Sequence, residues 1–138
     1  MNTLVRLIKA FEGLRLRSYL CPAGVWTIGY GSTGKDIGYG LVWTVEQAEA
    51  RMLKDASAYL AEARRLCPAL SSDRLEAVAD FAYNLGSVRL AGSTLRRRIN
   101  AGDILGASEE FEKWVFAGGI KLNGLILRRR AEKLAFLK

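Results

Sequence analysis

Apolar residues recur at helical spacing along most of this chain. Near the N-terminus, four of them follow the i, i+3, i+4, i+7 pattern, which predicts an amphipathic helix over residues 3–12. Thr3 can cap the start of this helix and Gly13 can end it. A longer apolar stripe behind a capping box predicts a second helix over residues 44–66. At the usual rise per residue that helix is about 33 Å long, which is enough to connect two lobes.

The chain beyond Cys67 and Pro68 is expected to be wholly helical. Glycines and capping residues divide this region into four segments. The predicted helices cover residues 73–85, 94–100, 103–116 and 125–137. Gly118 and Gly119 are interpreted as the break between the last two helices.

The pattern changes over residues 14–43, which are rich in glycine. Residues 25–30 alternate in the manner of a strand, with Trp26 on one face and Thr27 on the other. If the Trp26 face is buried, the Thr27 hydroxyl turns toward a cleft. The chain is therefore predicted to be a single α+β, mainly helical domain over residues 1–138. Its expected parts are a small lobe at about 13–43, a connecting helix at about 44–66, and a helical lobe at about 67–138 that includes the N-terminal helix.

Composition narrows the chemistry available to such a domain. None of the 138 residues is a histidine, which excludes Ser-His-Asp hydrolysis, Cys-His proteolysis and His-ligated zinc. Cys21 and Cys67 are too few for a four-thiolate metal site and lack CxxC spacing. No metal is therefore expected, and the cysteines are interpreted as free thiols, with a bridge between them as the alternative. A carboxyl group is the best remaining candidate for proton transfer near neutral pH.

The formal net charge of +7 is concentrated toward the two ends of the chain. This balance favours an anionic partner, whether nucleic acid or an acidic cell envelope, and does not choose between them. No stretch approaches the roughly 20 apolar residues of a membrane span, so stable membrane insertion is not expected. Arg6 and Lys9 interrupt the apolar residues at the N-terminus, so no signal peptide is expected either.

Three residues stand at a spacing that suggests catalysis. Glu12 ends the first predicted helix, Cys21 follows after eight residues, and Thr27 follows after five more. The negative end of the helix dipole opposes ionisation of Glu12, which suits a proton donor. Taken singly, the three residues have ordinary structural interpretations as a helix-end carboxylate, a small buried thiol and a strand former. Their joint spacing favours the catalytic interpretation.

With these residues, the chain resembles the phage lysozymes of the T-even and lambdoid endolysin family. That family carries a Glu, eight residues, an Asp or Cys, five residues and a Thr, which Glu12, Cys21 and Thr27 match. The resemblance covers essentially the whole chain. Its further matching segments are residues 11–14, 26–31, 83–86, 92–95, 114–119, 124–125 and 131–132.

The resemblance implies a lysozyme-like two-lobed fold and hydrolysis of the β-1,4 bond between N-acetylmuramic acid and N-acetylglucosamine in peptidoglycan, without a cofactor. Glu12 would be the general acid, and Cys21 and Thr27 would position the attacking water. The substrate-binding residues that it implies are Ser32, Thr33, Tyr83, Asn84 and Thr94. Ser32 replaces a frequent histidine of the family, which removes one possible ion pair.

Cys21 stands where many relatives carry Asp. The charge of the nearby Glu12 is expected to raise the pKa of this thiol, which would make it a weaker base than a carboxylate. A role in positioning is therefore expected for Cys21, with Glu12 carrying most of the catalysis.

Two other functions stay open. A lytic transglycosylase would cut the same bond with the muramoyl 6-hydroxyl in place of water, and a catalytically dead cationic module would bind peptidoglycan or nucleic acid. Residues 96–98 and 128–130 are arginine runs. Because successive helical residues fan out by about 100° each, these runs are interpreted as a solvated basic surface, and no nucleic-acid partner is expected.

The resemblance also implies where the protein acts. We expect a monomer that stays in the host bacterial cytoplasm until release and then acts on the periplasmic cell wall. Without an export signal, access to the wall would rely on a holin-like protein that opens the membrane. Delivery as an antagonistic toxin or as a tail component is the alternative.

Overall fold

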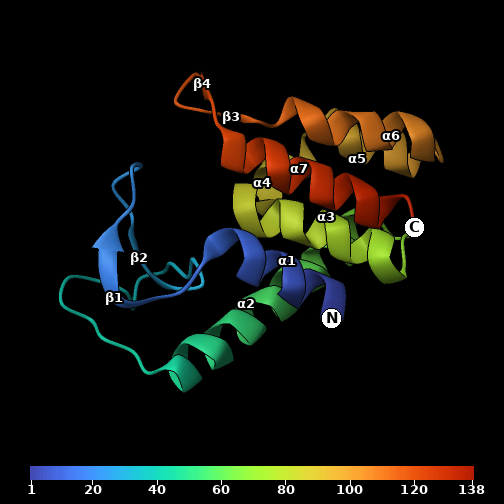
Figure 1. Ribbon diagram of the computed structural model, residues 1–138. Coiled ribbons are helices and arrows are strands. Elements are labelled where there is room, and N and C mark those ends of the chain that lie inside the picture. Colours follow the sequence, from blue (N-terminus) through green and yellow to red (C-terminus); the bar gives the residue numbers. More distant parts are fainter.

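The computed structural model describes all 138 residues and consists of a small lobe and a helical lobe joined by a long helix (Figure 1). In chain order the elements are α1 (Asn2–Glu12), β1 (Arg15–Leu20), β2 (Trp26–Gly29), α2 (Val45–Leu66), α3 (Ser72–Leu85), α4 (Ser87–Ala91), α5 (Thr94–Asn100), α6 (Ile104–Glu110), a 3-10 turn (Phe111–Lys113), β3 (Phe116–Ala117), β4 (Ile120–Lys121) and α7 (Asn123–Phe136). The expected α+β, mainly helical class is confirmed. No helix is at once long enough and apolar enough to cross a bilayer.

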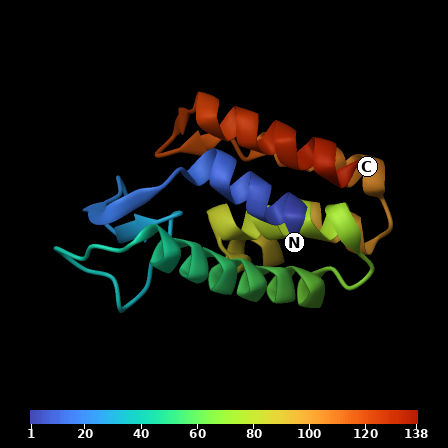
Figure 2. The same cartoon turned by 60° about the horizontal axis from the view of Figure 1, so that its bottom comes forward.

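The helical lobe is built around α3. This helix packs against α1, α2 and α7, and Figure 2 shows α1 between α7 and α2. The apolar faces of these helices meet in one core. Its largest fully buried apolar side chains are Phe81, Phe111, Phe136, Leu4, Ile8, Met52, Leu90 and Leu95. Burying a side chain of this size contributes about 1.5–3 kcal/mol, so this core is the main source of the lobe's stability.

The start of α1 is fixed to the first turn of α3. The helix begins at Asn2, so Thr3 is not its cap, and the Thr3 hydroxyl instead donates to Asp73 at 2.5 Å. The Glu76 carboxylate accepts the backbone N–H of Leu4 at 2.9 Å. The first N–H groups of a helix lack partners within it, so Glu76 takes the place of an N-cap side chain. These contacts fix the orientation of α1 and therefore the position of its last residue, Glu12.

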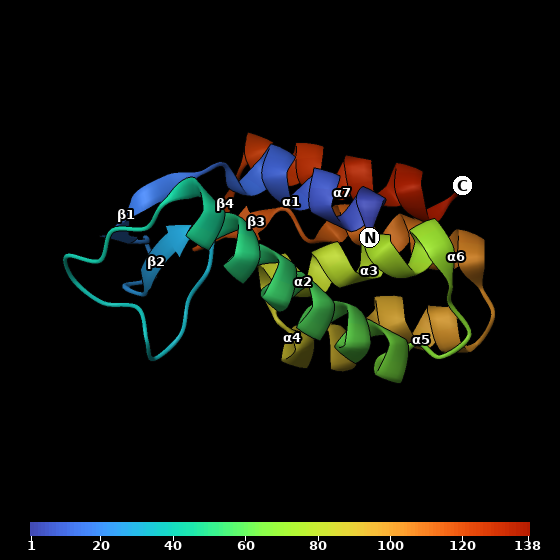
Figure 3. The same cartoon turned by 90° about the horizontal axis from the view of Figure 1, so that it is seen from below.

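The connecting helix α2 starts as predicted. Thr44 and Gln47 each accept the other's backbone N–H, which completes the capping box. Figure 3 shows α2 running from the small lobe along the helical lobe. Ala48 near its start and Met52 one turn later are fully buried, so the helix is packed along its length and holds the small lobe in place.

The small lobe contains an antiparallel pair, β1 and β2. Tyr19 lies opposite Thr27 and Leu20 lies opposite Trp26, with an irregularity in β1 toward Arg15. The predicted strand at 25–30 is confirmed at its centre, while its partner β1 was not located by the sequence pattern. Thr27 is buried, so little of its side chain is open to solvent.

The prediction of one helix over residues 103–116 is wrong. The helix α6 ends at Glu110, a 3-10 turn follows, and the chain then forms the β3–β4 hairpin. Gly118 and Gly119 have φ angles of 57° and 78°, the left-handed conformation that both central residues of a tight hairpin turn require. The glycine pair therefore forms the turn of a hairpin rather than a break between two helices. The hairpin lies at the same end of the molecule as the small lobe (Figures 1 and 3).

Candidate functional site

Glu12 is the last residue of α1 and lies where the helical lobe meets the small lobe. Its side chain is 19% exposed, and Arg128 of α7 donates to its Oε2 at 2.6 Å. A cavity of about 530 Å³ opens beside it. The residues that line this cavity are Ala10, Phe11, Glu12, Asn84, Leu122, Gly124, Leu125, Leu127 and Arg128. We call it the Glu12 cavity.

Gly31 lies close to the Glu12 oxygen that Arg128 does not bind. A Cβ added to Gly31 would come within 2.4 Å of Glu12 Oε1, a separation that no real side chain tolerates. Gly31 also has a φ of 78°, which strains any other residue. The glycine therefore lets the chain after β2 pass against the carboxyl. One oxygen of Glu12 faces this turn and the other binds Arg128.

Arg128 is fixed from the opposite side by Asp80 of α3. Its Nε and Nη2 donate to the two Asp80 oxygens at 2.9 and 2.8 Å, a bidentate pair in which both side chains are buried. Only Nη1 remains for Glu12, so Asp80 aims that nitrogen at the carboxylate. Burial opposes the charge of Arg128, but the bonds to Asp80 and Glu12 outweigh it and raise its pKa.

Two further buried ionisable side chains, Arg129 and Glu132, complete the cluster. Arg129 Nη2 donates to Asn84 Oδ1 at 2.7 Å, and Arg129 Nε lies 3.0 Å from Glu132 Oε1 without hydrogen-bond alignment. Burial is the main influence that raises the pKa of Glu132 well above its ordinary value, and its hydrogen bond with Asp80 acts in the same direction. Burial also opposes the charge of Asp80, yet the bonds from Glu132 and Arg128 lower its pKa. Of these two carboxyls, Glu132 therefore holds a proton more tightly than Asp80 does.

We expect Glu132→Gln to gain stability relative to the unchanged protein as the pH rises. The raised folded pKa means that the folded protein keeps a proton that the unfolded chain releases near the ordinary glutamate value. The stability contributed by Glu132 is therefore present at low pH and lost as the pH rises through the folded pKa. Urea unfolding between about pH 5 and 8 measures the difference. Glu112→Gln is the surface control, whose difference should stay constant over this range. A constant difference for Glu132→Gln as well would refute the assignment of the proton.

Cys21 and Thr27 are brought together by the turn between β1 and β2. The Val25 backbone N–H is the largest influence on Cys21, and with the Ala23 N–H and the Thr27 hydroxyl it lowers the pKa of the thiol. The expectation that Glu12 raises this pKa is wrong, because hydrogen bonds within the turn dominate. The Thr27 hydroxyl also lies 3.0 Å from the Val25 carbonyl. Its single proton serves either that carbonyl or a Cys21 thiolate.

Cys21 should react with a thiol reagent much faster than Cys67. Both cysteines are free, but Cys21 is partly exposed, whereas Cys67 is buried and its pKa is raised to about 11 by that burial. The thiolate is the reactive form, so iodoacetamide at pH 8 should label Cys21 at least about 100-fold faster. Peptide mass spectrometry measures both rates, with Cys67→Ala as the control that should label unchanged. Preferential labelling of Cys67 would contradict this structure of the turn.

The chain matches a known protein family along most of its length. The sequence model described as phage lysozyme matches residues 9–132. The chain belongs to the phage lysozyme family. Family membership and the structural similarities below make it a glycoside hydrolase of the lysozyme type.

Relatives and solved structures agree with this family. The chain is 42% identical to an endolysin of Acyrthosiphon pisum secondary endosymbiont phage 1, over 94% of this chain and 92% of that protein. It is 39% identical to a SAR-endolysin of Bacteriophage PS119, over 88% of this chain and 74% of that protein. The muramidase domain of SpmX from Asticaccaulis excentricus superimposes with a TM-score of 0.90 at 32% identity, covering 100% of this chain and 97% of the other. An endolysin from Escherichia coli O157:H7 phage FAHEc1 gives a TM-score of 0.87 at 32% identity, covering 100% and 92%.

The remaining residues that the phage lysozyme resemblance suggested fall in different places. Asn84 lines the Glu12 cavity. Thr33 and Tyr83 line a smaller hollow of about 80 Å³, together with Gly31, which itself contacts Glu12. The Tyr83 hydroxyl donates to the Tyr30 carbonyl at 2.6 Å, which ties α3 to the end of β2. Thr94 lies at the start of α5, where its hydroxyl accepts from Arg97, and it lines neither space.

Ser32 is 1% exposed and supports the small lobe from within. Its hydroxyl donates to Asp55 of α2 at 2.9 Å, so its direction is set by α2 rather than by a ligand. Asp55 also accepts from Arg51 at 3.0 Å, and Arg51 reaches the Thr33 carbonyl at 2.7 Å. The hydrogen bond from Ser32 and the Arg51–Asp55 pair within α2 thus hold this part of the small lobe against α2 in this phage lysozyme.

The interpretation of residues 128–130 as a solvated basic surface is wrong for two of the three arginines. Arg128 and Arg129 are buried, and only Arg130 is exposed. The sequence did contain a pattern that indicates the burial of Arg128 and Arg129. Leu125, Arg128, Arg129, Glu132 and Phe136 occupy the i, i+3, i+4, i+7 and i+11 positions of one helix face. Charged residues at the positions of a buried stripe indicate an internal ion cluster, and Asp80 of α3 completes it.

Proposed function

We propose that this phage lysozyme is an endolysin-type muramidase, which hydrolyses the β-1,4 bond between N-acetylmuramic acid and N-acetylglucosamine with Glu12 as general acid. The observation that supports this most directly is a partly exposed carboxyl at the edge of a cavity, held by an arginine that is itself fixed. A positioned carboxylic acid is what protonation of a glycosidic oxygen requires. The aliphatic lining from Leu122, Leu125 and Leu127 suits the apolar faces of sugar rings.

The two oxygens of Glu12 are assigned different tasks. Oε2 receives the Arg128 hydrogen bond and is held in place, so Oε1 is the oxygen that carries and delivers the proton. The bidentate pair with Asp80 keeps Arg128 in place, so the position of Glu12 Oε2 is fixed as well.

Cys21 and Thr27 are proposed to orient the attacking water. A hydroxyl can both donate to and accept from water, and the thiol beside it adds a second polar partner. The lowered pKa of Cys21 gives it a larger thiolate fraction than an ordinary cysteine has. It can therefore accept a hydrogen bond from water more strongly than the sequence suggested, in a position where many relatives carry Asp.

The products of digestion test the reaction. Purified peptidoglycan treated with the protein should yield fragments with reducing N-acetylmuramic acid ends, because water enters the cleaved bond. Mass spectrometry separates these from the anhydro ends of a lytic transglycosylase by about 18 Da, the mass of one water. Anhydro ends would overturn the hydrolase in favour of the transglycosylase. The absence of any fragment, with binding retained, would favour the cationic peptidoglycan-binding module.

The proposed setting is the lysis of a bacterial host. We propose a monomer that acts on peptidoglycan of the periplasmic wall after release from the cytoplasm with the help of a holin-like protein. The basic charge of the chain supports attraction to an anionic envelope. Expression in bacterial cells with and without a co-expressed holin, followed by culture turbidity, tests this route.

A further inference from the structure

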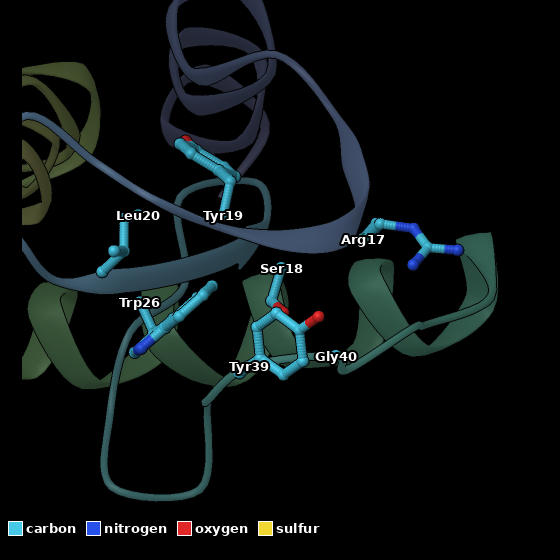
Figure 4. Close-up of a pocket in the computed structure, with 7 residues that line it drawn as sticks. All are labelled: Arg17, Ser18, Tyr19, Leu20, Trp26, Tyr39 and Gly40. Atoms are coloured by element: carbon cyan, nitrogen blue, oxygen red, sulfur yellow. The ribbon is translucent and has the colours of Figure 1, made fainter.

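A second pocket lies in the small lobe (Figure 4) and shares no lining residue with the Glu12 cavity. Its volume is about 320 Å³. The residues that line it are Arg17, Ser18, Tyr19, Leu20, Trp26, Tyr39 and Gly40. The rings of Trp26 and Tyr39 meet edge to face, with centroids 5.8 Å apart and planes inclined by 75°. We call this the Trp26–Tyr39 pocket.

The loop that carries Tyr39 is firmly held. The Ser18 hydroxyl donates to the Gly38 carbonyl at 2.8 Å and accepts the Leu41 N–H at 3.1 Å. The Ser18 N–H in turn donates to the Leu41 carbonyl at 2.9 Å. Tyr39 is nonetheless 90% exposed, so it contributes little to the core. A large aromatic side chain on a fixed loop, open to solvent and beside a second ring, is a pre-organised binding surface.

The rings of Trp26 and Tyr39 lie on the opposite face of the sheet from the Thr27 side chain. Leu20 and Trp26 form one cross-strand pair, and Tyr19 and Thr27 form the next, so the two pairs point to opposite sides. Figure 4 shows the Tyr19 ring on the far side of the strand from Ser18, Trp26 and Tyr39. A ligand that packs against the two rings is thus separated by the sheet from the face that carries Thr27.

The net positive charge around the pocket favours an anionic ligand. Residues 14–43 contain three basic side chains, Arg15, Arg17 and Lys35, against one acid. That acid, Asp36, is paired with Arg51 of α2 at 2.7 Å. Arg17 lines the pocket, is exposed and takes part in none of the chain's ion pairs. The pocket thus offers two aromatic rings for an apolar face and a free guanidinium for a carboxylate.

We propose that the Trp26–Tyr39 pocket binds an N-acetylated amino sugar of peptidoglycan together with a carboxylate of its peptide, on a glycan strand other than the one being cleaved. Sugar C–H faces and the acetyl methyl pack against the rings, and Arg17 pairs with the carboxylate. This inference rests on the proposed function for the identity of the polymer. Its consequence is that the enzyme stays on a multi-stranded wall between cleavages, while short soluble substrates do not engage the pocket productively.

A purified disaccharide-tetrapeptide fragment of peptidoglycan is the direct probe. We expect it to shift the NMR signal of the Trp26 indole N–H, assigned with Trp26→Phe, in the Glu12→Gln protein. Tyr39→Ala in that background should weaken this binding by roughly tenfold, because it removes one ring face. Tyr39→Phe should retain it, and Arg17→Ala should weaken it more for the peptide-bearing probe than for a neutral N-acetylglucosamine tetramer. Val88→Ala, at an exposed apolar site of α4, is the matched control and should change nothing.

Activity provides an independent measurement in the otherwise unchanged protein. Tyr39→Ala should raise the concentration of insoluble wall needed for half-maximal rate by about five- to tenfold. Its kcat on short soluble fragments should be unchanged. Equal probe binding by Tyr39→Ala, or a loss confined to binding of anionic lipid vesicles, would overturn the proposal. Because probe binding is read without catalysis, failure here is distinct from failure of Glu12 as the acid.

Discussion

Replacing Glu12 by glutamine is expected to reduce peptidoglycan hydrolysis by about 10³-fold while leaving the fold intact. Glutamine has nearly the same shape and its amide oxygen can still accept from Arg128 Nη1, but it has no proton of suitable acidity to give to the leaving oxygen. The lost rate therefore reports proton transfer rather than packing. Release of reducing ends from purified sacculi measures the effect over many orders of magnitude.

Glu49→Gln is the matched control for this substitution. Glu49 is a glutamate of α2 in a surface pair with Lys9 at 2.6 Å, so its replacement changes the same charge outside the Glu12 cavity. Its activity should stay within about twofold of the unchanged protein, since surface pairs contribute little. If Glu12→Gln were as active as Glu49→Gln, another group would have to supply the proton, and the assignment of Glu12 would be abandoned.

Replacing Arg128 by methionine should cost more stability than replacing any exposed charged residue of the chain. Methionine fills similar space, but it leaves Asp80 ionised and buried without its bidentate partner and Glu12 without its hydrogen bond. Breaking a buried ion pair from one side costs about 3–5 kcal/mol. The free energy of unfolding from urea titration, at a pH where Asp80 is ionised, measures the change.

Arg130→Met is the comparison that isolates burial. Arg130 is the next residue of the same helix but is exposed, so its replacement should change stability by no more than about 0.5 kcal/mol. A double variant, Arg128→Asn with Asp80→Asn, removes both charges of the pair. It should recover part of the stability that is lost when Arg128 alone is replaced. Equal stabilities for the Arg128 and Arg130 variants would show that the buried cluster does not hold the helical lobe together.

The buried cluster links stability to the proposed chemistry. Asp80 aims Arg128, and Arg128 holds Oε2 of Glu12, so α3 and α7 together position a residue of α1. Asp80→Asn should therefore lower activity through Glu12 orientation even in molecules that remain folded. The same arrangement explains why a helix face rich in charge is compatible with a buried position.

Local sequence signals predicted the helices well where their causes are local. The Thr44 and Gln47 capping box, the stop at Gly13 and the segment at 94–100 all follow from groups within one turn of each other. The short helix α4 and the strand β1 gave no comparable signal. The hairpin after Phe116 was mistaken for the end of a helix, because two adjacent glycines fit either a helix break or a tight turn.

The sequence by itself determined the chemistry that this protein can use and the family it belongs to. The lack of histidine made a carboxyl the expected proton donor, and the spacing of Glu12, Cys21 and Thr27 matched phage lysozymes. Only the tertiary structure decided what surrounds these groups. Arg128, Asp80 and Gly31 lie far from Glu12 in sequence or carry no motif, and they reach it because helix packing and a strand end converge there. Electrostatic effects depend on distance and burial in space. Spacing along the sequence therefore could not give the direction in which the Cys21 pKa is shifted, or the burial of Arg128 and Arg129.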